Sequence, residues 1–212
     1  MRKKILFSVI ALGISVGLLA QPDKYPIPEY SNEIYLVKKD SAITLMRLEK
    51  AFSKQEMKMK MMGMGGMDQG YEMDGEASTV RLAGGSNLVF VLYTGQSGFS
   101  SNPQSDSMMR ANGMDPAAVS AGMSMMGDPT STTSLYNMKE ENGKRKILTQ
   151  SMGLMGKSKK TATKYSLSIK KIKDSYYEII VDKTLPKGEY AFVMMSMSAD
   201  QSYKLFAFAI DN

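Results

Sequence analysis

The chain has 212 residues, no Cys, no His, 21 Met and a formal net charge of +6. This length suits one domain that can bury a sizeable core, and without Cys no disulfide can contribute, so packing alone must stabilise the fold. Without His, the sequence excludes the commonest general base and any Ser-His or Cys-His nucleophile, and we expect a protein that is not an enzyme.

The first twenty residues have the layout of a cleaved secretory signal. A basic start, "MRKK", precedes the uncharged apolar run 5–19, and the small residue Ala20 precedes Gln21; this is the order of a signal peptide. We expect cleavage after Ala20, a single domain over residues 21–212, and a secreted or periplasmic location without a transmembrane segment. An uncleaved anchor is the alternative. Loss of the three basic residues at positions 2–4 reduces the formal charge from +6 to +3.

From residue 30 onward, apolar and polar side chains alternate with a period of two, which is typical of β-strands. The first strands are predicted at 33–39, 43–51, 55–62, 78–84 and 86–95. The last of these is apolar on both faces, as in a central strand that is covered on each side.

The clearest hairpin signal lies in residues 133–150, where Asn142 and Gly143 suit a type I′ turn. Further strands are predicted at 163–173, 175–183, 189–197 and 202–211. The spacing predicts an all-β fold, an antiparallel β-sandwich of about ten strands. The residues expected in its core are Leu88, Phe90, Leu92, Tyr190, Phe192, Leu205 and Phe208.

Residues 95–132 interrupt the strand pattern and are rich in Gly, Ser, Met and Asn. We expect an insertion that carries one short helix, because Asp115 is a good N-cap, Pro116 suits the first helical position, and an apolar pattern continues to Gly127. A second irregular stretch is expected at 62–75.

The stretch "MKMKMMGMGGM", residues 57–67, holds six Met and three Gly. Thioethers are soft ligands that select Cu(I) or Ag(I). Met62, Met64 and Met67 are the candidate metal ligands, because a glycine-rich loop would free them from strand alternation. The alternative is a row of Met side chains that packs in the core or forms an adaptable contact surface.

Two charged stretches are further candidates. Asp68, Glu72, Asp74 and Glu76 offer four oxygen donors for Ca²⁺, or form a solvated acidic turn. Residues 139–173 hold eleven basic residues against two Glu, which favours an anionic glycan or lipid surface, or an acidic envelope protein, as partner. The alternative is that Lys on edge strands prevents edge-to-edge pairing. We expect no nucleic-acid partner.

The segments "LLAQ", "PEYSNEIYLVKKDS", "LPKGEYAF" and "LFAFAID" resemble uncharacterised secreted proteins of Bacteroidota-type bacteria. This resemblance implies export and a β-rich fold. The expected function is an exported, non-enzymatic binding or accessory module of the bacterial cell envelope. The alternatives are a Met-rich Cu(I)/Ag(I)-binding protein and a hydrolase with carboxylates assembled in space. No cofactor is expected apart from Cu(I) or Ca²⁺ at these candidate sites.

Overall fold

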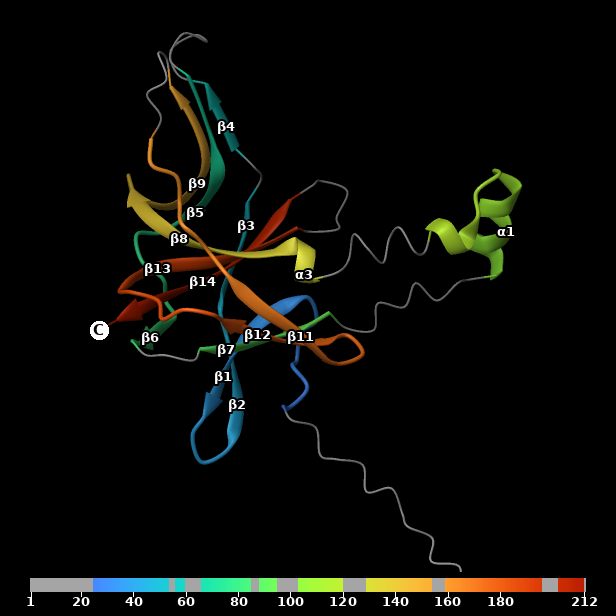
Figure 1. Ribbon diagram of the computed structural model, residues 1–212, viewed down its shortest axis with the longest axis horizontal. Coiled ribbons are helices and arrows are strands. Elements are labelled where there is room, and N and C mark those ends of the chain that lie inside the picture. Colours follow the sequence, from blue (N-terminus) through green and yellow to red (C-terminus); the bar gives the residue numbers. More distant parts are fainter. Residues whose placement is uncertain are drawn as a thin grey trace, which may run out of the picture.

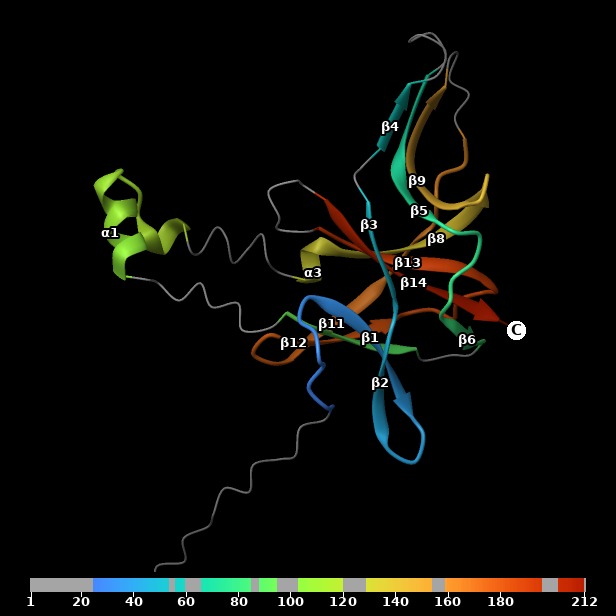
Figure 2. The ribbon, with the colours of Figure 1, turned by 180° about the vertical axis from the view of Figure 1, so that it is seen from behind.

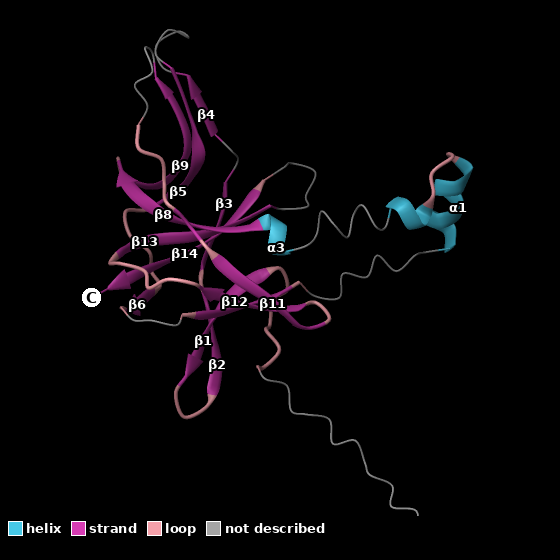
Figure 3. Ribbon diagram, viewed as in Figure 1, coloured by secondary structure: helices cyan, strands magenta, loops and turns pink. Residues whose placement is uncertain are grey.

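The computed structural model describes residues 25–53, 56–59, 66–84, 88–94, 103–119, 129–153, 159–195 and 202–211. Two β-sheets pack together in the body of the molecule (Figures 1 and 3). The predicted all-β sandwich is therefore confirmed. Within the described residues, none of the helices has the length and apolar character needed to cross a membrane.

The smaller sheet has five antiparallel strands. Its order is β11 (Leu167–Lys173), β12 (Tyr176–Val181), β7 (Val89–Tyr93), β1 (Glu33–Lys39) and β2 (Ile43–Arg47). β7 pairs with both β1 and β12, so the central position predicted from its apolar composition is confirmed.

The larger sheet runs β3 (Glu49–Ser53), β14 (Tyr203–Asp211), β13 (Gly188–Met195), β8 (Thr133–Glu141), β9 (Lys144–Gly153), β5 (Gly66–Asp74) and β4 (Glu56–Met59). The short β10 (Lys164–Tyr165) pairs with β8, and β6 (Arg81–Ala83) pairs with β14 in parallel. In Figure 1, β4, β5 and β9 stand above the sandwich as an arm.

The described residues form fourteen strands, more than the ten or so predicted. The predicted strand 43–51 divides at the buried Leu48: Arg47 pairs with Tyr35 in the smaller sheet, whereas Glu49 pairs with Ala207 in the larger one. The predicted irregular stretch 62–75 was wrong over residues 66–74, which form β5.

The main core lies between the two sheets. The Phe90 ring meets Phe192 edge-on with centroids 4.8 Å apart, and Tyr190 stacks on Phe208 at 5.6 Å. Of the predicted core residues, Leu88 is only half-buried, and the others are buried as expected: Phe90, Leu92, Tyr190, Phe192, Leu205 and Phe208.

β13 and β14 are buried on both faces. Their even-numbered residues at 190–194 and 206–210 enter the main core, whereas Ala191, Val193 and Leu205 belong to a second cluster that Tyr71 of β5 and Ile147 of β9 complete. The lower part of the arm therefore forms a cover over the outer face of the larger sheet.

The insertion contains more helix than predicted. α1 (Pro103–Ala111) and α3 (Pro129–Thr132) were not foreseen, and α1 stands away from the two sheets in both views (Figures 1 and 2). The predicted start at Pro116 is confirmed, since residues 116–119 are helical and the Ala117 N–H donates to Asp115 Oδ1 at 2.9 Å. The rest of that predicted helix lies outside the described residues.

Candidate functional site

A groove forms where the β8–β9 hairpin opens. The turn is the predicted one, with φ of 57° at Asn142 and 73° at Gly143. Only residues 139–141 of β8 pair with β9, at residues 144–146. Beyond this point the returning segment 159–163 lies between the two strands: the Ala162 N–H donates to Leu148 O at 2.7 Å, and the Asn137 N–H donates to Thr163 O at 3.2 Å.

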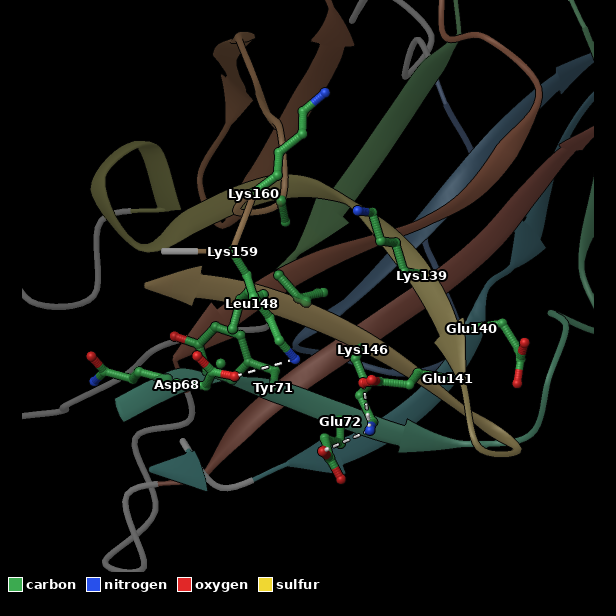
Figure 4. A pocket seen from close by; sticks show the side chains of 14 residues that line it. Asp68, Tyr71, Glu72, Lys139, Glu140, Glu141, Lys146, Leu148, Lys159 and Lys160 are labelled. Atoms are coloured by element: carbon green, nitrogen blue, oxygen red, sulfur yellow. Dashed lines mark hydrogen bonds and ion pairs between the residues drawn. The ribbon is translucent and has the colours of Figure 1, made fainter. Parts of the chain in front are cut away.

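The groove has a volume of about 630 Å³ and is lined by β5, by the turn-proximal parts of β8 and β9, and by residues 159–162 (Figure 4). Its lining carries four lysines and four carboxylates. They are Lys139, Lys146, Lys159, Lys160, Asp68, Glu72, Glu140 and Glu141. The site is therefore rich in both hydrogen-bond donors and charged acceptors, with no excess of either charge.

Two of these lysines are held by carboxylates. Lys146 Nζ lies 2.8 Å from Glu141 Oε2 and 3.7 Å from Glu72 Oε1. Lys159 Nζ lies 3.5 Å from Asp68 Oδ2, and Ser151 Oγ donates to the other oxygen of this carboxylate at 2.7 Å. The ion pair of Lys159 joins segment 159–162 to β5. In each of these ion pairs, the lysine and the carboxylate neutralise one another's charge.

The other two lysines of the groove differ. Lys139 and Lys160 are exposed, and neither has an ion-pair partner in the part of the chain that the structure describes. Lys139 also faces Lys146 directly across the β8–β9 ladder, and like charges in that position repel. As far as the described residues show, both ammonium groups are therefore available to an anionic group from outside the chain.

The acidic stretch does not assemble a calcium site. Asp68, Glu72 and Asp74 lie in β5 rather than in a loop, and a strand separates residues two or four apart along its length. Glu72 and Asp74 face Lys144 at 3.7 and 3.5 Å. Among the described residues, no three acidic side chains could hold one metal ion together.

Of the three predicted metal ligands, one lies within the described residues. Met62 and Met64 lie outside the described residues. Met67 lies in β5, so its expected loop position was wrong; it faces Met59 of β4 and Met152 of β9 in the strand register. The pairing of β5 with β9 was not foreseen, because the glycines of this stretch favoured a loop.

The basic stretch 139–173 does not form a single face. Arg145 is buried, whereas Lys170, Lys171 and Lys173 lie on β11, at the edge of the smaller sheet. This distribution favours the interpretation that the β11 lysines prevent edge-to-edge pairing of the sheet. The groove lysines remain as the basic residues that could bind a partner.

Arg145 is the centre of a buried polar network, and no feature of the sequence pattern distinguishes it from the neighbouring basic residues. Its guanidinium donates to both carboxylate oxygens of Glu49, at 2.5 and 3.1 Å, and to the carbonyls of Asp74 and Gly75 at 3.1 Å each. Glu189 Oε2 lies 3.8 Å from the same guanidinium. The network ties β9 to β3 and β13 and to the chain after β5.

The two carboxylates around Arg145 are the kind of pair that a hydrolase would need, but their environment favours a structural role. Burial raises the pKa of Glu49, yet hydrogen bonds from Arg145, Ser78 and the Thr79 N–H outweigh it, so the net shift is downward. A general acid requires the opposite shift. Burial likewise raises the pKa of Tyr71 beside the groove, so that phenol stays protonated.

No protein-family model, no curated protein and no solved structure matches this chain.

Proposed function

We propose that this protein is an exported, non-enzymatic binding module of the cell envelope, and that its groove binds an anionic glycan. The observation that carries the proposal is the contrast among the groove lysines. Lys146 and Lys159 have carboxylate partners, whereas Lys139 and Lys160 have none in the described part of the chain. A carboxylate on a ligand would supply the missing partner.

The size and composition of the groove fit a short sugar segment. Its volume of about 630 Å³ falls within the range of about 300–1,000 Å³ that is usual for ligand sites. Uronic acids carry one carboxylate per sugar together with several hydroxyls. Lys139 and Lys160 would bind the carboxylates of the sugars. The side chains of Asp68, Glu72 and Glu141 would accept hydrogen bonds from the sugar hydroxyls.

The same composition argues against a nucleic acid. Nucleic-acid backbones carry dense phosphate charge and are bound by surfaces with an excess of Lys and Arg. The groove instead has four carboxylates beside its four lysines, and these would repel closely spaced phosphates. A ligand with sparse negative charge avoids this repulsion.

The export part of the proposal rests on the signal-like residues 1–20.

The experiment is calorimetric titration of the chain with oligogalacturonate, and with a neutral maltooligosaccharide as ligand control. Lys139→Gln combined with Lys160→Gln should weaken binding by roughly tenfold or more, since two charge-assisted contacts are lost. The matched control is Lys38→Gln combined with Lys183→Gln, which removes the same charge at two exposed positions outside the groove.

The control variant should bind as the unmodified protein does, and added salt should weaken binding in both. The proposal is rejected if oligogalacturonate does not bind, if the neutral sugar binds equally well, or if the two double variants lose the same affinity.

A further inference from the structure

A cluster of charged side chains lies where the chain passes from the smaller sheet to the larger one. Glu33 of β1 is buried, and its carboxylate accepts two hydrogen bonds from the Arg47 guanidinium, at 2.6 and 2.8 Å. Lys50 Nζ lies 2.9 Å from Glu33 Oε1. Arg47 and Lys50 flank the buried Leu48, where β2 ends and β3 continues toward the larger sheet (Figure 2). Side chains from both sheets therefore meet at one carboxylate.

Lys204 of β14 adds a third positive charge to this cluster. In the strand register it lies opposite Phe52 and diagonal to Lys50, which itself lies opposite Phe206. Diagonal neighbours share one face of a sheet and are within reach of long side chains. Burial lowers the pKa of the Lys204 ammonium below its ordinary value, the charge of Lys50 lowers it further, and Glu33 raises it by a smaller amount. Lys204 is thus a half-buried cation beside a second cation.

The cluster holds more positive than negative charge. Three cationic side chains surround one carboxylate, which leaves a formal excess of two positive charges. Glu29 lies beside the hydroxyl of Tyr30, whose ring contacts Arg47, whereas the carboxylate that acts on Lys204 is Glu33. Within the described ranges, no hydrogen bond or ion pair joins Lys204 to another residue. A half-buried charge is costly without a partner, and an anion that enters the cluster removes this cost.

Solvent reaches the cluster beside two aromatic rings. Phe52 is 61% exposed, and Lys50 Nζ lies 5.2 Å from the centroid of its ring. Tyr30 is also exposed, and Arg47 Cζ lies 4.3 Å from its ring centroid. The side chain of Lys50 retains 28% of its exposure although it contacts Glu33. The Phe52 ring therefore offers an apolar surface next to the ammonium groups, on which the organic part of a ligand can pack.

We propose that Lys50 and Lys204 bind the phosphate group of a phosphate monoester. The second pKa of such a group is about 6, so it is a dianion at pH 7.5, and it balances the excess of two positive charges where one carboxylate would not. Its three terminal oxygens can accept hydrogen bonds from both ammonium groups at once. Arg47 keeps its bidentate contact with Glu33 and holds that carboxylate in place.

This site is separate from the groove and goes beyond the glycan function proposed for it. None of the residues of the cluster lines the groove. The two sites also differ in charge, because the groove has as many carboxylates as lysines, whereas cations outnumber carboxylates here. The groove therefore suits sparse negative charge, and the cluster suits one doubly charged group.

The test is calorimetric titration of the full chain with glucose 6-phosphate at pH 7.5, with glucose as the ligand control. A second arm measures sedimentation with phosphatidylcholine vesicles that contain phosphatidate, which carries the same phosphate monoester on a lipid. Lys204→Gln should weaken binding by roughly tenfold or more, since one charge-assisted contact is lost. The matched control Lys39→Gln removes the same charge at an exposed position at the far end of β1 and should bind as the unmodified protein does.

The two arms distinguish the source of the phosphate. Lys204-dependent binding of glucose 6-phosphate supports a soluble ester, and Lys204-dependent binding of the vesicles alone supports a lipid headgroup. The proposal is overturned if neither probe binds, if glucose binds as well as its phosphate, or if the Lys204 and Lys39 variants lose equal affinity.

The groove variant, Lys139→Gln combined with Lys160→Gln, separates the two proposed functions. It should retain the phosphate binding, and Lys204→Gln should retain the binding of oligogalacturonate. Loss of glucose 6-phosphate binding in the groove variant, with retention in Lys204→Gln, would place the phosphate in the groove and overturn the present proposal.

A measurement on the unmodified protein avoids any dependence on variant folding. With the lysine side chains labelled with carbon-13, the Lys204 resonance should titrate below the ordinary pKa of lysine, because of burial and the charge of Lys50. Saturating glucose 6-phosphate should raise this pKa, since the bound dianion stabilises the charged ammonium, and should leave the pKa of Lys39 unchanged. An unchanged pKa of Lys204 under these conditions would show that the phosphate does not bind beside it.

Discussion

At the scale of single residues, the charged side chains of this protein divide into those that hold the fold together and those that remain available. Arg145 and Lys146 are adjacent in the sequence, yet Arg145 is fully buried against Glu49, whereas Lys146 lines the groove. The sequence could not separate these roles, because its alternating pattern places a basic residue on both faces of β9. Only the pairing of β9 with β5 decides which face is covered.

Removal of the Arg145 guanidinium should be severely destabilising. In Arg145→Met, the partly buried Glu49 carboxylate loses its two strongest donors, and the carbonyls of Asp74 and Gly75 lose theirs. Breaking a buried pair in this way costs about 3–5 kcal/mol. Urea unfolding should show this loss, while the exposed-site control Lys187→Met should change the unfolding free energy little. Equal stabilities of the two variants would contradict the structural role of Arg145.

The carboxylates of Glu33 and Glu49 should make the protein sensitive to acid. Burial raises the pKa of Glu33, but Arg47 and Lys50 lower it by a larger amount. The pKa values of Glu33 and Glu49 therefore both lie below the ordinary 4.5. Because the folded pKa is the lower one, each contributes stability above the unfolded pKa and loses it as the pH falls through the folded value.

The unfolding free energy should therefore decrease as the pH falls below about 4.5. Glu33→Gln should be less stable at pH 7, since Arg47 and Lys50 lose their carboxylate, and its stability should fall less steeply on the acid side. Urea unfolding from pH 7 to pH 3 measures both slopes. Parallel curves for the variant and the unmodified protein would contradict the assignment.

At the scale of elements, the sequence predicted strands well wherever residues alternate and failed where glycines obscured the pattern. The hairpin at Asn142 and the central position of β7 followed from local signals. β5 did not, because Gly66 and Gly70 suggested a loop, whereas its pairing with β9 along residues 66–74 overrides that preference. The division of 43–51 between two sheets is likewise a tertiary event that local alternation cannot reveal.

Gly70 is required for β5 to approach β9. A Cβ atom at this position would lie 2.0 Å from Ile147 O, beside the register shift at Gln69 and Gly70. Because the obstructing atom belongs to the backbone, Gly70→Ala must displace one strand, and we expect a loss of about 1–3 kcal/mol, as for other overpacked sites. Gln69→Ala on the same strand is the control.

Thermal unfolding of the two variants tests the expectation for β5, and hydrogen exchange at β5 and β9 amides should increase in Gly70→Ala alone. An alanine at position 70 that leaves both measurements unchanged would mean that the two strands do not approach so closely.

At the scale of the whole molecule, both sheets are covered on their outer faces by parts of the chain whose role the sequence did not predict. The arm covers the larger sheet through Tyr71 and Ile147. The segment before β1 covers the smaller sheet: Tyr25 packs in a cluster with Tyr35 and Tyr176, and Tyr176 donates a hydrogen bond to Pro26 O at 2.8 Å. The sandwich thus has three apolar layers instead of one.

Tyr25 should therefore matter to the stability of the whole fold, although it lies before the first strand. The residue is 3% exposed, and its hydroxyl donates to the buried Glu178 carboxylate. Tyr25→Ala removes a buried aromatic side chain, which typically costs about 3–5 kcal/mol, and takes one donor from Glu178. The control is Tyr30→Ala in the same segment, where the residue is 43% exposed and its ring contacts Arg47; a loss of about 1 kcal/mol or less is expected there. Urea unfolding of both variants decides between a structural cover and a loosely attached N-terminal segment, since the latter would give similar small losses at both positions.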